Sequence, residues 1–318
     1  MRELTIQKND ADQRLDRFLG KAVPLLPASL AQKYIRLKRI KVNGARAERD
    51  YRLCEGDRLQ LYLNDEFFEA PSEENVYLTI VNPRLHIIYE DENIMLLDKP
   101  AGMVVHADEG EKVNTLVNHL LAYLYQKREW KPREENAFTP ALCNRIDRNT
   151  GGIVIAAKNA EALRVLNEKI RERELSKFYL CICLGRPEPP KGRIECFLRK
   201  DSKTNTVRVY HHPVPDGRSA VTLYETLETR DRLSLVEVEL LTGRTHQIRA
   251  SFADMGHPLL GDGKYGVGSV NRRYGETQQA LYSYRLRFDF PTDAGILNYL
   301  RGREFIADEV PFRWKYFG

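Results

Sequence analysis

The chain has 318 residues, of which 42% are hydrophobic and 30% are charged, and its net charge at pH 7 is +5. The apolar content excludes a chain that is disordered over most of its length, and the length predicts about two domains. No apolar run reaches the ~18 residues of a membrane helix, and the N-terminus lacks the apolar region of a secretory signal. The five cysteines are scattered without a CxxC pair, which argues against a disulfide scaffold and favours the cytoplasm.

The N-terminal segment predicts a small unit of two helices and a short sheet. Residues 14–19 begin one helix, and Ser29 is placed to cap a second helix over residues 30–37. Asn43-Gly44 is a strong hairpin-turn signal, and residues 58–63 alternate apolar and polar side chains as a strand does.

Positive charge is concentrated in this small unit. Residues 33–58 contain nine basic and four acidic side chains, an excess equal to that of the whole chain. Such a patch is an electrostatic footprint for phosphates, although an ordinary solvated surface explains the charge equally well. The candidate phosphate-binding residues are Lys33, Arg36, Lys38, Arg39 and Lys41.

The pattern changes after an acidic stretch with two prolines at residues 64–84. Beyond it, short apolar runs predict strands, and Asn159 precedes a helix whose apolar residues recur at helical spacing. This irregular mixture predicts an α+β fold with a mixed, largely antiparallel sheet flanked by helices. We therefore divide the chain into a small α/β domain, a linker and a larger domain, at residues 1–70, 71–84 and 85–318. The expected strands of the larger domain include 86–90, 94–97, 153–157, 179–184 and 235–240.

Two polar segments lie next to predicted strands, where active sites commonly form. In the first, Asp147 lies between Arg145 and Arg148 and precedes a glycine pair, so two guanidinium groups are placed to keep a potential nucleophile or base ionised. A structural turn with exposed arginines explains the same pattern. The second segment leaves a strand with two arginines, a histidine and a glutamine within residues 243–249.

Other segments favour ordinary structural roles. Residues 261–266 match GxGxxG but lack the strand and helix that a dinucleotide-binding loop requires, so no nicotinamide cofactor is expected. His246 and His257 have no carboxylate or thiol at ligand spacing, so no metal is expected. Lys99-Pro100-Ala101-Gly102 predicts a simple turn, and Tyr179 is either a core residue or a stacking platform, with the pattern favouring core.

Taken together and in this order, the segments from about residue 85 to 300 resemble the RluA-type pseudouridine synthases. The similarity includes Arg145-Ile146-Asp147, Lys177-Phe178-Tyr179 and the complete Gly-Arg-Thr-His-Gln-Ile-Arg motif at 243–249. Residues 13–63 resemble the S-four-type RNA-binding domain that often precedes such catalytic domains. The sequence departs from the family pattern at Asn144, Ile146, Gly151 and Tyr282-Ser283. None of these departures removes the Asp, Tyr or Arg of the family motifs.

The resemblance implies an isomerase that converts uridine in RNA to pseudouridine without metal or cofactor. It implies Asp147 as the essential carboxylate and Arg249 as the ion-pair partner that orients it. Tyr179 is implied to stack on the target base after that base has left the RNA stem, and Arg145 to fill the space left behind. Arg244 and His246 are the further expected RNA contacts.

The expected partner is large-subunit ribosomal RNA, with transfer RNA as the alternative, and the expected protein is a cytoplasmic monomer that binds no membrane. Two other functions remain open at this stage. One is a non-catalytic RNA-binding or ribosome-assembly protein on the same scaffold. The other is a nicotinamide enzyme that uses the glycine-rich loop.

Overall fold

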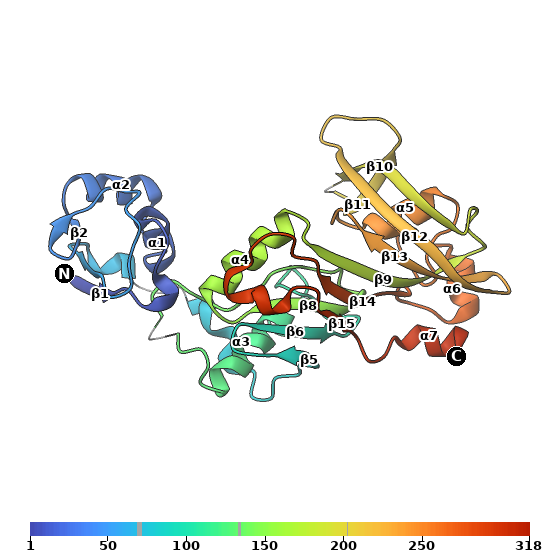
Figure 1. The fold of residues 1–318 in the computed structure, drawn as a ribbon, viewed down its shortest axis with the longest axis horizontal. Coiled ribbons are helices and arrows are strands. Elements are labelled where there is room, and N and C mark those ends of the chain that lie inside the picture. Colours follow the sequence, from blue (N-terminus) through green and yellow to red (C-terminus); the bar gives the residue numbers. More distant parts are fainter. Residues whose placement is uncertain (69–71, 133–134, 202) are drawn as a thin grey trace. The chain divides into compact units, whose positions relative to one another are not determined.

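The structure is a computed structural model that describes residues 1–68, 72–132, 135–201 and 203–318. The chain divides into two compact units, which Figure 1 shows as ribbons. Unit 1 comprises residues 1–84, 117–141 and 157–164, and unit 2 comprises residues 85–116, 142–156 and 165–318.

Unit 1 contains the predicted helices and short sheet of the N-terminal segment. Four strands pair in the order β1-β4-β2-β3, and all three pairings are antiparallel. The elements of residues 1–84 are β1 (Arg2–Thr5), η1 (Lys8–Asp10), α1 (Leu15–Ala22), α2 (Ala28–Arg36), β2 (Ile40–Val42), β3 (Ala45–Arg46), β4 (Arg58–Leu61), η2 (Asp65–Phe68) and η3 (Ser72–Thr79). Buried side chains from α1, α2 and the sheet, including Phe18, Ile35 and Leu59, form its core.

Three local predictions for this unit can be compared with the structure. The Asn43-Gly44 turn is confirmed, since both residues have positive φ (52° and 78°) and join β2 to β3. The predicted cap at Ser29 is wrong, because the carbonyl of Pro27 already accepts the first helical bonds from Leu30 and Ala31. The 64–84 stretch includes the 3-10 helices η2 and η3, and the expected domain boundary at residues 70–71 lies outside the described residues.

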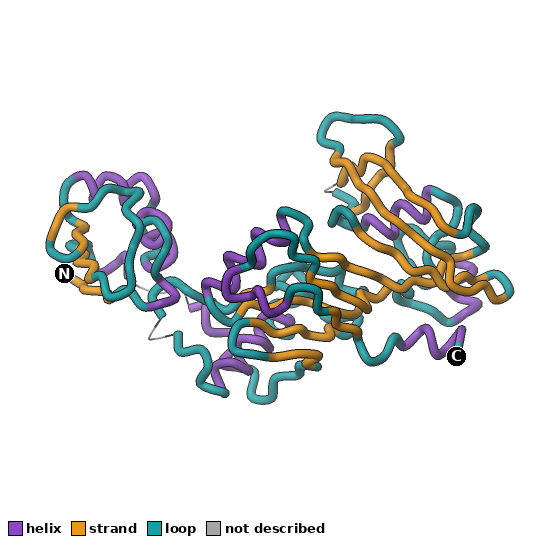
Figure 2. The backbone as a smooth tube through the Cα atoms, in the orientation of Figure 1, coloured by secondary structure: helices purple, strands orange, loops and turns teal. Residues whose placement is uncertain are grey.

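Unit 2 is built on a large mixed sheet; Figure 2 colours its strands orange, like those of the small sheet of unit 1. The strand order is β11-β10-β12-β13-β9-β14-β8-β6-β5, with β15 beside β14 and β7 beside β8. Pairings from β11 to β14 and between β5 and β6 are antiparallel, whereas β14 and β8 are parallel. The predicted α+β class with a mixed, largely antiparallel sheet is therefore confirmed.

The expected strands are all present, and all extend beyond the expected residues except β5, which begins one residue later than expected. The strands are β5 (Ile87–Glu90), β6 (Ile94–Lys99), β7 (Ala141–Leu142), β8 (Gly151–Ala157), β9 (Leu175–Leu184), β10 (Lys191–Asp201), β11 (Thr206–Tyr210), β12 (Arg218–Arg230), β13 (Leu233–Leu240), β14 (Leu281–Phe288) and β15 (Glu304–Ile306). The remaining helices are α3 (Leu116–Gln126), α4 (Ala160–Arg171), α5 (Gln247–Asp254), α6 (Gly268–Tyr274), η4 (Gly295–Leu300) and α7 (Pro311–Phe317). Asn159 caps α4 as predicted, since its Oδ1 accepts from the Ala162 N–H at 2.9 Å.

Two features of unit 2 place the functional segments. Helix α5 packs against β10, β11 and β12, where Ala250 joins a buried cluster with Cys196 and Val207. The start of β8 approaches β14 so closely that a Cβ on Gly152 would overlap the Ser283 carbonyl, and one on Gly151 would overlap the Tyr282 ring. Both glycines are therefore required where the loop that carries Asp147 enters the sheet. Among the described residues, no helix has the length and apolar character needed to cross a membrane.

Candidate active site

A pocket of about 570 Å³ lies in unit 2, between the loop before β8, the start of β9 and the segment that joins β13 to α5. It collects residues that are far apart in the sequence, including the complete set predicted for catalysis. The predicted site residues that line it are Arg145, Asp147, Tyr179, Arg244, His246 and Arg249. Of the predicted phosphate contacts in unit 1, Lys33 and Arg36 lie on α2, Lys41 lies on β2, and Lys38 and Arg39 lie in the turn between these elements. All except the half-buried Lys41 are exposed.

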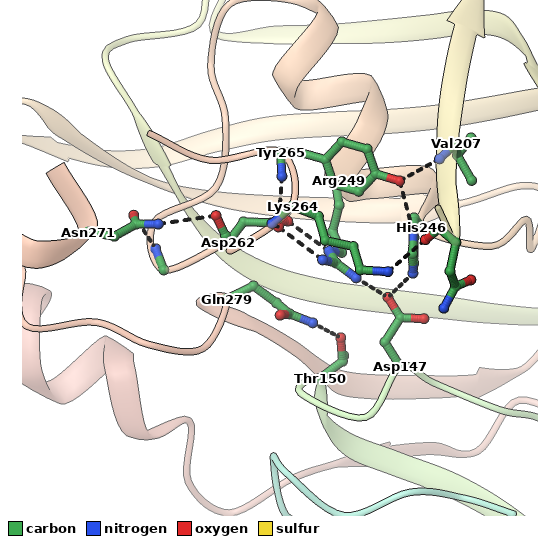
Figure 3. Close-up of polar contacts among 12 residues, drawn as sticks. Asp147, Thr150, Val207, His246, Arg249, Asp262, Lys264, Tyr265, Asn271 and Gln279 are labelled. Atoms are coloured by element: carbon green, nitrogen blue, oxygen red, sulfur yellow. Dashed lines mark hydrogen bonds and ion pairs between the residues drawn. The ribbon is translucent and has the colours of Figure 1, made fainter. Parts of the chain in front are cut away.

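The centre of the site is an arginine shared by two carboxylates (Figure 3). Arg249 donates from Nη1 to Oδ2 of Asp147 at 2.8 Å, and from Nε and Nη2 to the two oxygens of Asp262 at 2.7 and 2.9 Å. The side chains of Arg249 and Asp262 are 6% and 0% exposed, whereas that of Asp147 is 26% exposed. Asp147 is thus the carboxylate that remains open to the pocket.

Asp262 accepts hydrogen bonds from two backbone amides as well as from Arg249. Its Oδ1 also accepts the backbone N–H groups of Lys264 and Tyr265, at 2.8 and 3.1 Å. Burial opposes the charge, but the hydrogen bonds and charge of Arg249, with these two amides, hold the pKa of Asp262 below its usual value. Sequence reasoning assigned no role to this residue, because the 261–266 loop was weighed as a cofactor motif and otherwise counted only toward the family resemblance.

The turn before α5 explains why the 243–249 motif places Arg249 at the pocket. The buried Gln247 accepts hydrogen bonds at Oε1 from the Arg244 N–H and the Thr242 hydroxyl, at 3.0 and 2.9 Å. Its amide donates to the Val221 carbonyl and the Thr222 hydroxyl on β12. With all these bonds satisfied, Gln247 fixes the first turn of the helix to the sheet.

His246 lies inside this cluster. Its Nδ1 is 2.8 Å from the Tyr265 hydroxyl, and its Nε2 is 3.7 Å from Oδ2 of Asp147. The side chain is only 8% exposed. Burial lowers the pKa of His246 to about 4, with the charges of Arg249 and Lys264 adding to the effect and Asp147 opposing it.

The pattern-based expectation that Arg145 and Arg148 flank and stabilise Asp147 is wrong for Arg148. Its guanidinium binds both oxygens of Asp108, at 2.9 and 2.8 Å. Arg145 is exposed at the pocket. The guanidinium that contacts Asp147 comes from Arg249, 102 positions along the chain.

The Lys99 turn has a larger structural role than its sequence indicated. Lys99 is fully buried, and its Nζ donates to the carbonyls of Pro100, Met103 and Arg148 at 3.0, 2.8 and 3.0 Å. Burial lowers its pKa to about 7. Three acceptors match the three N–H groups of an ammonium, so this side chain ties the loop after Asp147 to the 100–103 turn.

Strand β9 contributes Leu175, Lys177 and Tyr179 to the pocket wall. Tyr179 is buried, as its pattern favoured, and it also lines the pocket; its role as a stacking platform stays a prediction. Burial raises the pKa of Tyr179 to about 12, and burial lowers the pKa of Lys177. The phenol is therefore protonated at neutral pH. Within the described ranges, no group of three His, Cys, Asp or Glu side chains is arranged to hold a metal ion.

Comparisons with known proteins agree with this architecture. Residues 93–254 match the RNA pseudouridylate synthase family, and residues 13–59 match the S4 domain. An uncharacterized RNA pseudouridine synthase of Mycoplasma genitalium is 33% identical over 89% of this chain and 88% of its own length. The ribosomal large subunit pseudouridine synthase C of Vibrio parahaemolyticus is 30% identical over 91% of this chain and 88% of its own length.

A solved human structure, RNA pseudouridylate synthase domain containing 1, shares the fold, with a TM-score of 0.56 at 22% identity over 76% of this chain and 86% of that one. The chain belongs to the RNA pseudouridine synthases, which are isomerases that act on RNA, and within them to the RluA type. The predicted family, fold class and enzyme class are thereby confirmed.

Proposed function

We propose that this enzyme converts specific uridines of structured RNA to pseudouridine, that its substrate is large-subunit ribosomal RNA, and that Asp147 is its catalytic carboxylate. Asp147 carries the proposal, because it is the sole carboxylate among the described residues that line the pocket and Arg249 holds one of its oxygens. Preorganisation of this kind is what a reacting carboxylate needs, since it must be ionised and correctly placed before the substrate arrives.

The isomerisation itself balances without any co-reactant. The bond between the sugar C1′ and N1 of uracil breaks, the base turns, and C1′ bonds to C5. The proton on C5 is lost, and N1 gains one. The pocket supplies Asp147 for the step at the glycosidic centre, as nucleophile or base, and the protonated Tyr179 at its wall.

Access to a uridine inside an RNA stem requires that the base leave the stack, at a cost of a few kcal/mol. Stacking on an aromatic ring returns about 1–3 kcal/mol, and Tyr179 supplies such a ring in the pocket. Arg145 is exposed at the same pocket, and a planar cation is suited to stack between bases where the uridine was.

The names of relatives support ribosomal RNA as the substrate, and the basic residues of this chain support binding to RNA in general. Several relatives carry the name ribosomal large subunit pseudouridine synthase C. The S4 domain of this chain presents exposed cations on and after α2. The basic residues of the pocket wall are suited to bind the phosphates beside a flipped base. These pocket residues are Arg145, Arg171, Arg173, Lys177 and Arg244.

The test is release of tritium from RNA labelled at C5 of uracil, with no added cofactor. We expect the wild-type enzyme to release tritium from unmodified large-subunit RNA and Asp147→Asn to release none while binding that RNA with similar affinity. Asp231→Asn is the matched control, because Asp231 is an exposed turn residue with φ 53° that asparagine tolerates.

Two results would contradict the proposal. Equal loss of binding and turnover in Asp147→Asn would remove the catalytic role of this residue. Tight binding by the wild type without release, on both naked RNA and immature large subunits, would favour a binding protein instead.

A further inference from the structure

His246 is turned toward Asp147 in this structure. Its Nε2 faces the same Oδ2 atom that receives the Arg249 Nη1–H, at 3.7 and 2.8 Å respectively (Figure 3). With 8% of its side chain exposed, the ring offers little surface to an RNA strand. This geometry differs from the expectation that His246 is an RNA contact.

The Tyr265 hydroxyl determines which ring nitrogen of His246 carries the proton. A backbone amide can only donate, and the Val207 N–H on β11 donates to the Tyr265 oxygen at 2.7 Å. The hydroxyl proton is then directed to its other neighbour, Nδ1 of His246, at 2.8 Å. A neutral imidazole that accepts at Nδ1 carries its proton on Nε2.

An imidazolium would be less well accommodated here. It would donate from Nδ1 to a Tyr265 oxygen that already accepts from Val207, and the hydroxyl proton would then lose its partner. The burial that lowers the pKa of His246 to about 4 likewise favours the neutral ring at pH 7.

We propose that Tyr265 fixes the Nε2–H tautomer of His246. This N–H points its positive end at Oδ2 of Asp147 from 3.7 Å, which is beyond hydrogen-bond distance, while Arg249 binds the same oxygen, so that Oδ1 is the reacting oxygen. His246 is then a positioning residue. The inference rests on the proposed catalytic role of Asp147. Among the described residues, none donates a hydrogen bond to Oδ1, and Figure 3 shows that oxygen without a partner.

The surroundings of Tyr265 make this chain of contacts rigid. The His246 and Tyr265 rings meet edge to face at 5.6 Å, and the Arg249 guanidinium lies 5.3 Å from the centre of the Tyr265 ring. The Tyr265 N–H is bonded to Asp262, and Lys264 beside it donates to the Asn205 carbonyl at 2.6 Å. The loop is thus attached to the β10–β11 hairpin on one side and to the Arg249 pair on the other.

The first test is the tautomer itself, measured by ¹⁵N NMR of the imidazole in the full-length protein at pH 7. We expect the shifts of His246 to show a protonated Nε2 and an unprotonated Nδ1. A protonated Nδ1, or a cationic ring, would overturn the inference. This readout does not depend on catalysis, so it remains interpretable if Asp147 has another role.

The second test separates positioning from RNA binding in single-turnover kinetics at saturating RNA. His246→Asn tolerates the φ of 52° at this position but is too short to reach Asp147, so we expect the rate to fall about 100-fold. His246→Gln carries an amide N–H at greater reach and should recover part of that loss. Tyr265→Phe should lower the single-turnover rate about 10-fold, because the tautomer of His246 is no longer fixed.

The dissociation constant for RNA should change less than about threefold in all three variants, since none removes a phosphate contact. Tyr224→Phe is the matched control, because it removes a buried tyrosine hydrogen bond, to the Pro189 carbonyl, outside the pocket. An unchanged saturating rate with weaker RNA binding in His246→Asn would restore the role of RNA contact and refute the proposal.

Discussion

Arg249 and Asp262 form a buried bidentate ion pair, with hydrogen bonds of 2.7 and 2.9 Å and side chains that are 6% and 0% exposed. A planar, two-point pair fixes the orientation of the guanidinium group. The Nη1 of this group donates to Asp147. Burial alone would lower the pKa of Arg249, but the two carboxylates raise it above its usual value, so the residue remains a cation.

Asp262→Asn should therefore affect both stability and catalysis. Loss of the charge leaves a buried guanidinium with Asp147 as its only anionic partner among the described residues, and we expect about 3 kcal/mol of destabilisation. Arg249 would also lose its fixed orientation, so turnover should fall at least about 10-fold. Urea unfolding and single-turnover tritium release measure the two effects.

Asp289→Asn provides the comparison for Asp262→Asn. Asp289 pairs with Arg287 at a partly exposed position, so its loss should cost less than about 1 kcal/mol and leave turnover unchanged. Equal effects of the two substitutions would show that the Arg249 pair has no special role.

Local sequence patterns predicted the helices, strands and turns well, but they predicted poorly which side chains contact each other. Alternation identified β4 and β13, the Asn43-Gly44 turn followed from residue type, and Asn159 marked the start of α4, because each signal lies within a few residues. The pattern around Asp147 suggested its neighbour Arg148 as a partner, whereas Arg148 binds Asp108, 40 positions away.

The parts of the site that local patterns did not predict are long-range contacts. The pair between Arg249 and Asp147 was predicted only from the family resemblance, because 102 positions separate the two residues. Lys99 was assigned to a simple turn because its third acceptor, the Arg148 carbonyl, lies 49 positions away. The sequence showed Tyr265 only as part of a glycine-rich loop, whereas the structure shows that its hydroxyl contacts both Val207 and His246. Tertiary packing creates these sites, and no local pattern specifies it.

Gly151 and Tyr282 are predicted to be energetically coupled. A Cβ at 151 would overlap the Tyr282 ring, and that buried ring cannot move freely because its hydroxyl donates to Asp98 at 2.6 Å. Gly151→Ser should destabilise the protein by about 2 kcal/mol. The same substitution in a Tyr282→Ala background should cost much less, giving a coupling of about 1–2 kcal/mol in a double-mutant cycle measured by urea unfolding.

Gly20→Ser is the control for Gly151→Ser. A Cβ on Gly20 would meet no described atom within 4 Å, so the substitution should not destabilise the protein. Strict additivity of Gly151→Ser and Tyr282→Ala would contradict the predicted contact.

The basic residues after the start of α2 should control the salt dependence of RNA binding. Lys33, Arg36 and Arg39 are exposed, and we expect their joint replacement by alanine to weaken binding and reduce the slope of log K against log salt by about 3. The saturating turnover rate should stay unchanged. The joint variant Lys8→Ala with Lys21→Ala removes exposed charge from the same unit outside the patch, and its slope should match the wild type. An unchanged slope in the triple variant would identify the patch as ordinary solvated surface.

The stability of the protein should depend on pH through His246. Its pKa is about 4 in the folded protein and about 6.5 when unfolded, so between these values the unfolded chain binds a proton that the folded chain does not. Stability is therefore lost as the pH falls through this window. The charged groups around the ring are Asp147, Arg249, Asp262 and Lys264.

From pH 7 to pH 5, the wild type should lose about 2 kcal/mol more of its unfolding free energy than His246→Asn, which has no titrating ring at this position. Urea unfolding at pH 7, 6 and 5 gives the comparison, since each protein is its own reference at pH 7. Parallel pH curves for the two proteins would mean that the ring titrates alike in the folded and unfolded states. The buried, neutral histidine on which the fixed tautomer depends would then be excluded.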